Sequence, residues 1–128
     1  MLIKVLRSKI HRARVTDAHL EYEGSITIDE DLMDAAGFID SEAVLVANLS
    51  TGSRHETYVM KGERGSGTIC ANGAAARLTQ IGDRVIILGF AYLDPKELLE
   101  HVPRKIVLDD ENRIVRGPRG GRPGKPSS

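Results

Sequence analysis

Residues 83–94, DRVIILGFAYLD, give the strongest strand signal in the chain. Aliphatic, β-branched and aromatic residues fill this stretch, and an aspartate stands at each end, a pattern typical of a core strand. Weaker strand signals lie to either side of it. They are the alternating residues 9–15, SITI at 25–28, the apolar run EAVLVANL at 42–49, a stretch centred on Thr57 and Tyr58, TICANG at 68–73, and a hairpin over 104–115. The run at 42–49 predicts a strand buried on both faces.

Helix signals are fewer and shorter. A helix is predicted from about Asp29, where acidic residues begin it, to Gly37, which ends it. A second is predicted within 74–82, and a third begins at Pro95, a residue favoured in a first turn. Many short strands with two or three short helices favour a mainly β fold, a small single-domain barrel, over a sandwich or a doubly wound sheet.

Composition sets the domain limits. With 128 residues, 41% of them hydrophobic, the chain can build one compact core, which we expect over residues 1–115. The last stretch, RGPRGGRPGKPSS at 116–128, holds only glycine, proline, serine and basic residues. It has nothing to bury, so it is expected to be a disordered basic tail.

Charge and composition argue against several partners and locations. Eighteen basic and eighteen acidic residues cancel, and aromatic residues make up only 4%, which argues against nucleic-acid binding. No apolar run is long enough to span a bilayer and no signal peptide is evident, so no membrane partner is expected. The single Cys70 excludes an intrachain disulfide framework, and a cytoplasmic location is the expectation.

The familiar catalytic motifs are missing. The four histidines show neither HExxH spacing nor a cysteine at zinc-site spacing, so no metal centre is expected. The glycine-rich GERGSG at 62–67 lacks the lysine of a phosphate-binding loop, and no GxSxG nucleophile elbow occurs.

Three Gly-Ser pairs occur, at 24–25, 52–53 and 65–66, and each alone predicts a turn. Context distinguishes the first. The stretch KIHRARVTDAHLEYEGSITIDEDLMDAAG (9–37) closely resembles the processing region of the pyruvoyl-dependent aspartate 1-decarboxylases. The stretch RHETYVMKGERGSGTICANGAAA (54–76) resembles a second signature of that family.

The resemblance implies a double-psi β-barrel that cuts itself between Gly24 and Ser25. The serine hydroxyl attacks the preceding carbonyl, and an ordered turn can lower the barrier to such an attack by about 7–11 kcal/mol. Gly24, which has no Cβ, is expected to adopt a strained turn there. Elimination and loss of ammonia then leave a short chain, 1–24, and a longer chain whose Ser25 has become a covalently bound pyruvoyl group, with no metal and no pyridoxal phosphate.

The resemblance also implies the reaction and the partners. The pyruvoyl ketone forms a Schiff base with the amine of L-aspartate and withdraws electrons as the α-carboxylate leaves. β-Alanine and CO2 are released, and β-alanine feeds pantothenate and hence coenzyme A synthesis. Family members are homotetramers with active sites between adjacent subunits, and some use a helper protein for maturation.

Tyr58 and Thr57 are implied to be site residues. Tyr58 occupies the family's proton-donor position, and a phenol stays protonated at neutral pH; taken alone, it reads as a barrel-lining tyrosine. Thr57 is implied to hydrogen bond to the scissile carbonyl and to substrate, although threonine is also an ordinary strand residue. Because neighbours on a regular strand point to opposite faces, a twist, a bulge or a site shared between subunits is needed to unite them.

The remaining implied residues bind the substrate. Arg54 and Lys9 supply positive charge for the two carboxylates, although Lys9 alone reads as a solvated surface residue. The backbone N–H groups at the start of NGAAA can hold a carboxylate if a helix begins there; the alternatives are an Asn-Gly turn or a tightly packed helix. The residues of this group are Gly73, Ala74 and Ala75, together with Asn72, which can cap the helix, orient the turn or touch substrate, and Tyr22, which is expected to line the pocket.

Two rivals of another class remain. One is a barrel that binds nucleic acid weakly through the basic tail. The other is a barrel that never cuts itself and binds a protein or a small ligand, with Gly24-Ser25 as an ordinary turn.

Overall fold

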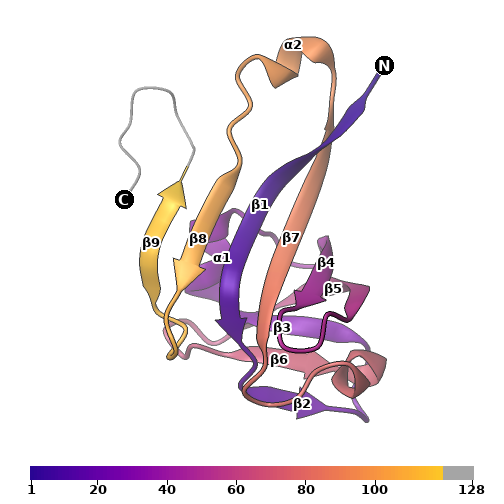
Figure 1. Ribbon diagram of the computed structural model, residues 1–128, viewed down its shortest axis with the longest axis vertical. Helices are drawn as coiled ribbons and strands as arrows, with labels where there is room; N and C mark the ends of the chain where they lie inside the picture. Colours follow the sequence, from indigo (N-terminus) through magenta and orange to yellow (C-terminus); the bar gives the residue numbers. More distant parts are fainter. Residues whose placement is uncertain (120–128) are drawn as a thin grey trace.

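The computed structural model describes residues 1–119 (Figure 1). Nine strands and three short helices follow one another along this part of the chain. In order they are β1 (Ile3–Arg14), β2 (Asp17–His19), β3 (Ser25–Asp29), α1 (Glu30–Ala36), β4 (Ala43–Asn48), β5 (Arg54–Gly62), β6 (Ile69–Asn72), the 3-10 helix η1 (Gly73–Arg77), β7 (Arg84–Leu93), α2 (Pro95–Leu98), β8 (Arg104–Leu108) and β9 (Ile114–Arg119). The fold is mainly β, as predicted.

All nine strands join one sheet in the order β2-β6-β3-β5-β4-β7-β1-β8-β9. Three pairings are parallel, β1 with β8, β2 with β6 and β3 with β5, and the others are antiparallel. In Figure 1, β1, β7, β8 and β9 run along the long axis, while β2, β3 and β6 cross near one end. The segment after β1 contacts β6, toward the opposite end of the strand order: Thr16 N donates a hydrogen bond to Ile69 O at 2.8 Å. The sheet therefore curls into a small barrel.

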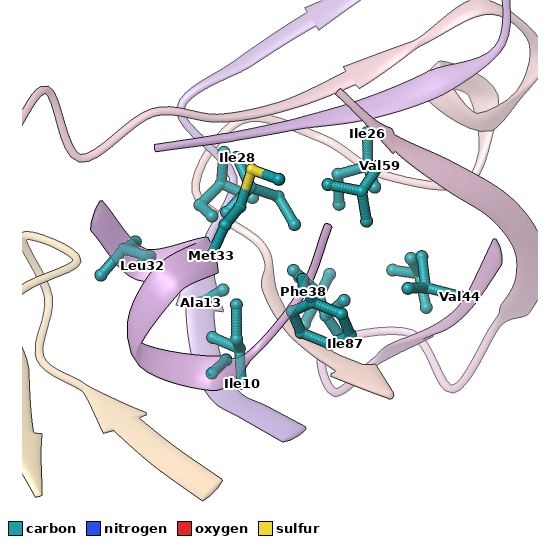
Figure 2. Close-up of a cluster of buried hydrophobic side chains, with 14 of the residues drawn as sticks. Ile10, Ala13, Ile26, Ile28, Leu32, Met33, Phe38, Val44, Val59 and Ile87 are labelled. Carbon is teal, nitrogen blue, oxygen red and sulfur yellow. The ribbon is translucent and has the colours of Figure 1, made fainter. Parts of the chain in front are cut away.

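The core lies inside this curled sheet and is closed by α1. Alternate residues of the strands point inward, as in Ile26 and Ile28 of β3 and Val44 and Val46 of β4, and all are buried. Helix α1 contributes Leu32, Met33 and Ala36 from one face. Figure 2 shows Met33 and Leu32 on the helix beside the isoleucines and valines of the strands.

Helix α1 begins and ends as its sequence predicts. The Asp29 side chain caps it by accepting from Asp31 N, and Gly37 ends it at φ +82°, in the left-handed region that favours glycine. Helix α2 likewise begins with a capping box between Asp94 and Glu97.

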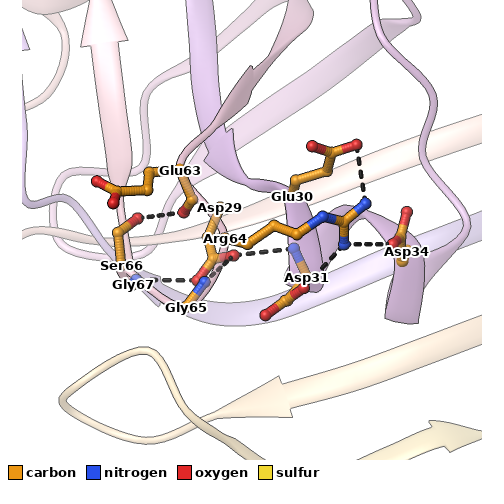
Figure 3. A network of polar contacts seen from close by, with 9 residues as sticks. All are labelled: Asp29, Glu30, Asp31, Asp34, Glu63, Arg64, Gly65, Ser66 and Gly67. Carbon is orange, nitrogen blue, oxygen red and sulfur yellow. Dashed lines mark hydrogen bonds and ion pairs between the residues drawn. The ribbon is translucent and has the colours of Figure 1, made fainter.

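The glycine-rich stretch 62–67 folds around the start of α1. Buried Asp29 accepts from Asp31 N (2.8 Å), Gly65 N (3.1 Å) and Gly67 N (2.9 Å). Next to it, the Arg64 guanidinium forms ion pairs with three carboxylates of α1 (Figure 3); these belong to Glu30, Asp31 and Asp34. One carboxylate thus ties the loop to the helix and to the end of β3.

Replacing Asp29 with alanine is expected to lower the free energy of unfolding by about 2–4 kcal/mol, because it removes a helix cap and leaves two further backbone N–H groups without an acceptor. Urea denaturation measures the loss. Asp40→Ala is the matched control, since exposed Asp40 accepts one backbone hydrogen bond, from Lys61 N. Equal losses in the two variants would contradict the structural role given to Asp29.

Three expectations need correction. β4 is buried on one face only, since Leu45 and Ala47 are half-exposed. The helix predicted within 74–82 is the five-residue 3-10 helix Gly73–Arg77, which ends before the exposed Gln80–Gly82 turn. Residues 116–119, which the sequence predicts to be part of the tail, belong to β9, which pairs with β8. The rest of that predicted tail, 120–128, lies outside the described residues.

Within residues 1–119, none of the helices has the length and apolar character needed to cross a bilayer.

Candidate active site around Ser25

The Gly24-Ser25 peptide lies where an exposed loop enters the barrel. Gly24 is exposed, whereas Ser25 is the first residue of β3 and is only 5% exposed. The expected strain at Gly24 is absent: its φ is not positive, and a Cβ there would meet no atom within 4 Å. By contrast, Gly52 and Gly65 of the other two pairs have φ of +80° and +74°, as turn glycines do. The first pair is therefore not an ordinary turn of the same kind.

Asn72 contacts the serine directly. Ser25 of β3 and Asn72 of β6 are register partners in an antiparallel pair, so their side chains lie on the same face. Asn72 Nδ2 lies 3.0 Å from Ser25 Oγ, to which it donates. Asn72 occupies the N-cap position of η1, but its side chain makes no capping hydrogen bond there.

The same amide has two further partners. Nδ2 also donates to Thr27 Oγ1 at 3.0 Å, and the Cys70 thiol donates to Oδ1 at 3.2 Å. Burial, with a smaller contribution from the charge of Asp17, raises the pKa of Cys70, so its sulfur keeps the proton that it donates.

Gly73 packs against the loop that ends at Ser25. It has φ +68°, and a Cβ there would lie 2.8 Å from Gly24 Cα, Gly24 N and Tyr22 O. After it, Ala74 is exposed and Ala75 buried in the short η1. The backbone of residues 22–24 thus leaves no room for a side chain at position 73, which explains the glycine of NGAAA.

The Tyr22 side chain lies at the surface of the loop before Ser25. It is 61% exposed, and its ring stacks on His19 with centroids 4.6 Å apart. Stacking fixes the ring at the surface of the loop, close in sequence to the Gly24–Ser25 peptide bond.

β5 carries three predicted residues on two faces. Arg54 and Tyr58 are exposed, whereas Thr57 is half-buried, following the alternation of a regular strand. Pairing with β3 sets Val59 opposite Ile26, so residues 57 and 58 lie level with the Gly24–Ser25 peptide bond. No register shift interrupts β5 on either side, which removes a bulge as the means of uniting Thr57 and Tyr58.

Lys9 lies on β1, which is separated from β3 by β7, β4 and β5 in the sheet. It is half-buried between Leu88 and Lys105 on the neighbouring strands. Within residues 1–119, no hydrogen bond or ion pair joins Lys9, Arg54 or Tyr58 to Ser25. One chain therefore brings together Gly24, Ser25, Asn72 and Gly73.

His11, two residues after Lys9, lies in a positively charged part of β1. Burial lowers its pKa, and the charges of Lys9, Arg12 and Arg116 lower it further, so the ring is neutral at pH 7.

Thr27 and Cys70 were missed from the sequence, where Cys70 reads as a small buried apolar residue. The available signal is the spacing Ser25-x-Thr27 and Cys70-x-Asn72 on two predicted strands, since residues two apart share a face. What the sequence lacks is the register that sets the two pairs opposite one another.

Comparison with known proteins finds one family and several relatives that cover most of the chain. Residues 1–115 match the family described as aspartate decarboxylase. The chain is 60% identical over 116 residues to the aspartate 1-decarboxylase of Caldicellulosiruptor saccharolyticus, covering 91% of each chain. It is 55% identical to the proteins of the same name from Bacillus cytotoxicus (90% of this chain, 91% of the relative) and Heliobacterium modesticaldum (93% and 90%).

Proposed function

This chain belongs to the aspartate decarboxylase family, and on that premise we propose that it decarboxylates L-aspartate to β-alanine and CO2 with a pyruvoyl group made from its own Ser25. It is an enzyme, a carboxy-lyase, that supplies β-alanine for pantothenate synthesis. The observation that carries the proposal is the contact between Asn72 Nδ2 and Ser25 Oγ beside an exposed Gly24. The rival readings, a non-catalytic binding module or a nucleic-acid binder, are not favoured.

Self-cleavage needs a serine hydroxyl held beside an accessible carbonyl. Ser25 Oγ attacks the Gly24 carbonyl carbon, the Gly24–Ser25 amide bond breaks, and an ester with a free Ser25 amine results. The donated hydrogen bond from Asn72 supports this step, because it fixes Oγ without using the serine's own proton. The ester then breaks as the Ser25 Cα proton leaves, and water replaces the nitrogen, which departs as ammonia.

The residues around Ser25 fit a pyruvoyl group. When present, it supplies a ketone that condenses with the substrate amine and draws electrons from the bond to the departing carboxylate. Asn72 donates a hydrogen bond to the serine hydroxyl oxygen. Its amide is therefore suited to donate to an oxygen of the pyruvoyl group, which is built from the carbon atoms of Ser25. Gly73 leaves room for the cut end of residues 22–24.

The other residues bind substrate and move a proton. Tyr58 Oη donates a proton to the substrate Cα after the carboxylate leaves, since a phenol is protonated at neutral pH. The guanidinium of Arg54 and the ammonium of Lys9 bind the carboxylates of aspartate, with Arg54 suited to two parallel hydrogen bonds.

We further propose that each active site forms between two subunits of a homotetramer. Support comes from β5, on which the exposed Tyr58 and Arg54 face away from the half-buried Thr57 with no bulge to reorient them. In that arrangement Thr57 contributes to the active site at Ser25 of its own chain, and the exposed side chains of β5 contribute to the active site of a neighbouring subunit. A cytoplasmic enzyme is part of the proposal, in keeping with the buried free thiol of Cys70. Maturation is expected to proceed either alone or with a helper protein.

Tyr58→Phe tests the reaction apart from the cleavage. The wild-type enzyme is expected to form equal amounts of CO2 and β-alanine from L-aspartate. The variant keeps Ser25 and Asn72, so it is expected to be cut normally but to lose about 10²–10⁴-fold in kcat, the usual contribution of a general acid.

The matched control is Tyr92→Phe, which removes the hydroxyl of another exposed strand tyrosine and is expected to keep full activity. A cut wild-type enzyme that forms no β-alanine would overturn the proposed function, and full activity in Tyr58→Phe would overturn the role of Tyr58.

A further inference from the structure

Four side chains share one face of the β3–β6 pair. Ser25 lies opposite Asn72, and Thr27 lies opposite Cys70, in an unbroken antiparallel register. The residues that alternate with them, Ile26, Ile28 and Ile69, belong to the core on the other face. The face next to the scissile bond is thus a small hydrogen-bonded group, and only one of its members, Ser25, reacts.

Asn72 is the centre of that group. A carboxamide offers two N–H donors and one carbonyl acceptor, and here all three are engaged. The two donors reach Ser25 Oγ and Thr27 Oγ1, each at 3.0 Å, and the acceptor receives the Cys70 thiol proton at 3.2 Å.

The orientation of an amide depends on what its two ends meet. A protonated thiol favours the carbonyl end on its side, because a thiol is a weak acceptor for an N–H group. The raised pKa of buried Cys70 keeps that proton in place at neutral pH. Thr27 Oγ1 gives the second N–H an acceptor, so a rotation of the amide would break bonds at both ends.

We propose that Thr27 and Cys70 are positioning residues for self-cleavage: together they hold the Asn72 carboxamide in the orientation that donates to Ser25 Oγ. The inference rests on the self-cleavage proposed above and adds two residues to it. Neither touches the Gly24 carbonyl, so each acts only through Asn72.

Two matched pairs of variants separate hydrogen bonding from packing. Thr27→Val keeps the branched shape but removes the hydroxyl, whereas Thr27→Ser keeps the hydroxyl but removes a methyl group. Cys70→Ala removes the donor, whereas Cys70→Ser keeps one in a side chain of similar size. Thr68→Val is the external control, since the Thr68 hydroxyl lies in the loop around α1, where its oxygen is 2.8 Å from Ser66 Oγ.

Each chain is made by cell-free synthesis in the same extract, and the uncut fraction is followed over time on denaturing gels, with thermal unfolding of the product measured in parallel. Thr27→Val and Cys70→Ala are expected to be cut about tenfold more slowly or worse, because small misplacements of reacting groups cost large factors in rate. The two serine variants are expected to restore most of the rate, and Thr68→Val to match the wild type.

Cleavage of Thr27→Val and Cys70→Ala at the wild-type rate would overturn the inference. A Thr27→Ser variant that is cut as slowly as Thr27→Val would also overturn the inference, because packing of the methyl group would then explain the slower cleavage. If the wild-type chain itself stays uncut, the proposed function fails first; if it is cut and all four variants match it, only the inference fails.

Discussion

Replacing Ser25 with alanine is expected to leave one uncut chain with no decarboxylase activity. The substitution removes the hydroxyl oxygen that is proposed to attack the Gly24 carbonyl, and intramolecular placement of this kind is equivalent to an effective concentration of about 10⁵–10⁸ M. It removes little else, because Ser25 is small and its hydroxyl accepts a hydrogen bond from Asn72. A denaturing gel after prolonged incubation measures the result.

The other two Gly-Ser pairs supply matched controls. Ser53 and Ser66 each follow a turn glycine of positive φ, and their hydroxyls donate to backbone carbonyls, of Leu78 and Glu63 respectively. Ser53→Ala and Ser66→Ala are therefore expected to be cut like the wild type. A cut Ser25→Ala chain, or an uncut Ser53→Ala chain, would contradict the assignment of the cleavage site.

Gly73→Ala is expected to slow self-cleavage by about 10²-fold or more, the scale of effect that follows from displacing reacting groups by an ångström. The new Cβ would lie 2.8 Å from three backbone atoms, two of Gly24 and one of Tyr22. Backbone atoms cannot rotate away as a flexible side chain does, so the segment carrying the scissile carbonyl must shift. The uncut fraction over time again gives the measurement.

The left-handed backbone of Gly73 adds a separate cost, and a control isolates it. Gly52 has a similar φ of +80°, but a Cβ there would meet no atom within 4 Å. Both alanine variants are expected to lose about 1–2 kcal/mol of stability from the strained backbone. Only Gly73→Ala is expected to lose cleavage; equal cleavage rates in the two variants would show that the contact with residues 22–24 does not matter.

Local signals in the sequence predicted much of the fold. Helix α1 was placed between Asp29 and Gly37 because capping and termination depend on single residues at fixed positions. Strand β7 follows from an apolar run too rich in β-branched residues for a loop. The error at β4 has a physical cause: a continuous apolar run does not say whether Leu45 and Ala47 face a second layer or solvent.

The site was less accessible to sequence reasoning. The resemblance predicts Ser25 as the reacting serine, but the contact that Asn72 makes with it depends on the register of β3 with β6, which is set by contacts far apart in the chain. The same register defines the neighbours Thr27 and Cys70. Thr57 and Tyr58 were correctly expected to face opposite ways, a local property of any regular strand.

The intact mass of the purified protein under denaturing conditions tests the central claim most directly. The account predicts two chains, residues 1–24 ending in Gly24 and residues 25–128 beginning at position 25, the longer one lighter by one NH3 than simple hydrolysis would give. That missing ammonia marks the conversion of Ser25 into a pyruvoyl group. A single chain with the mass of all 128 residues, unchanged after incubation with cell extract, would contradict the account.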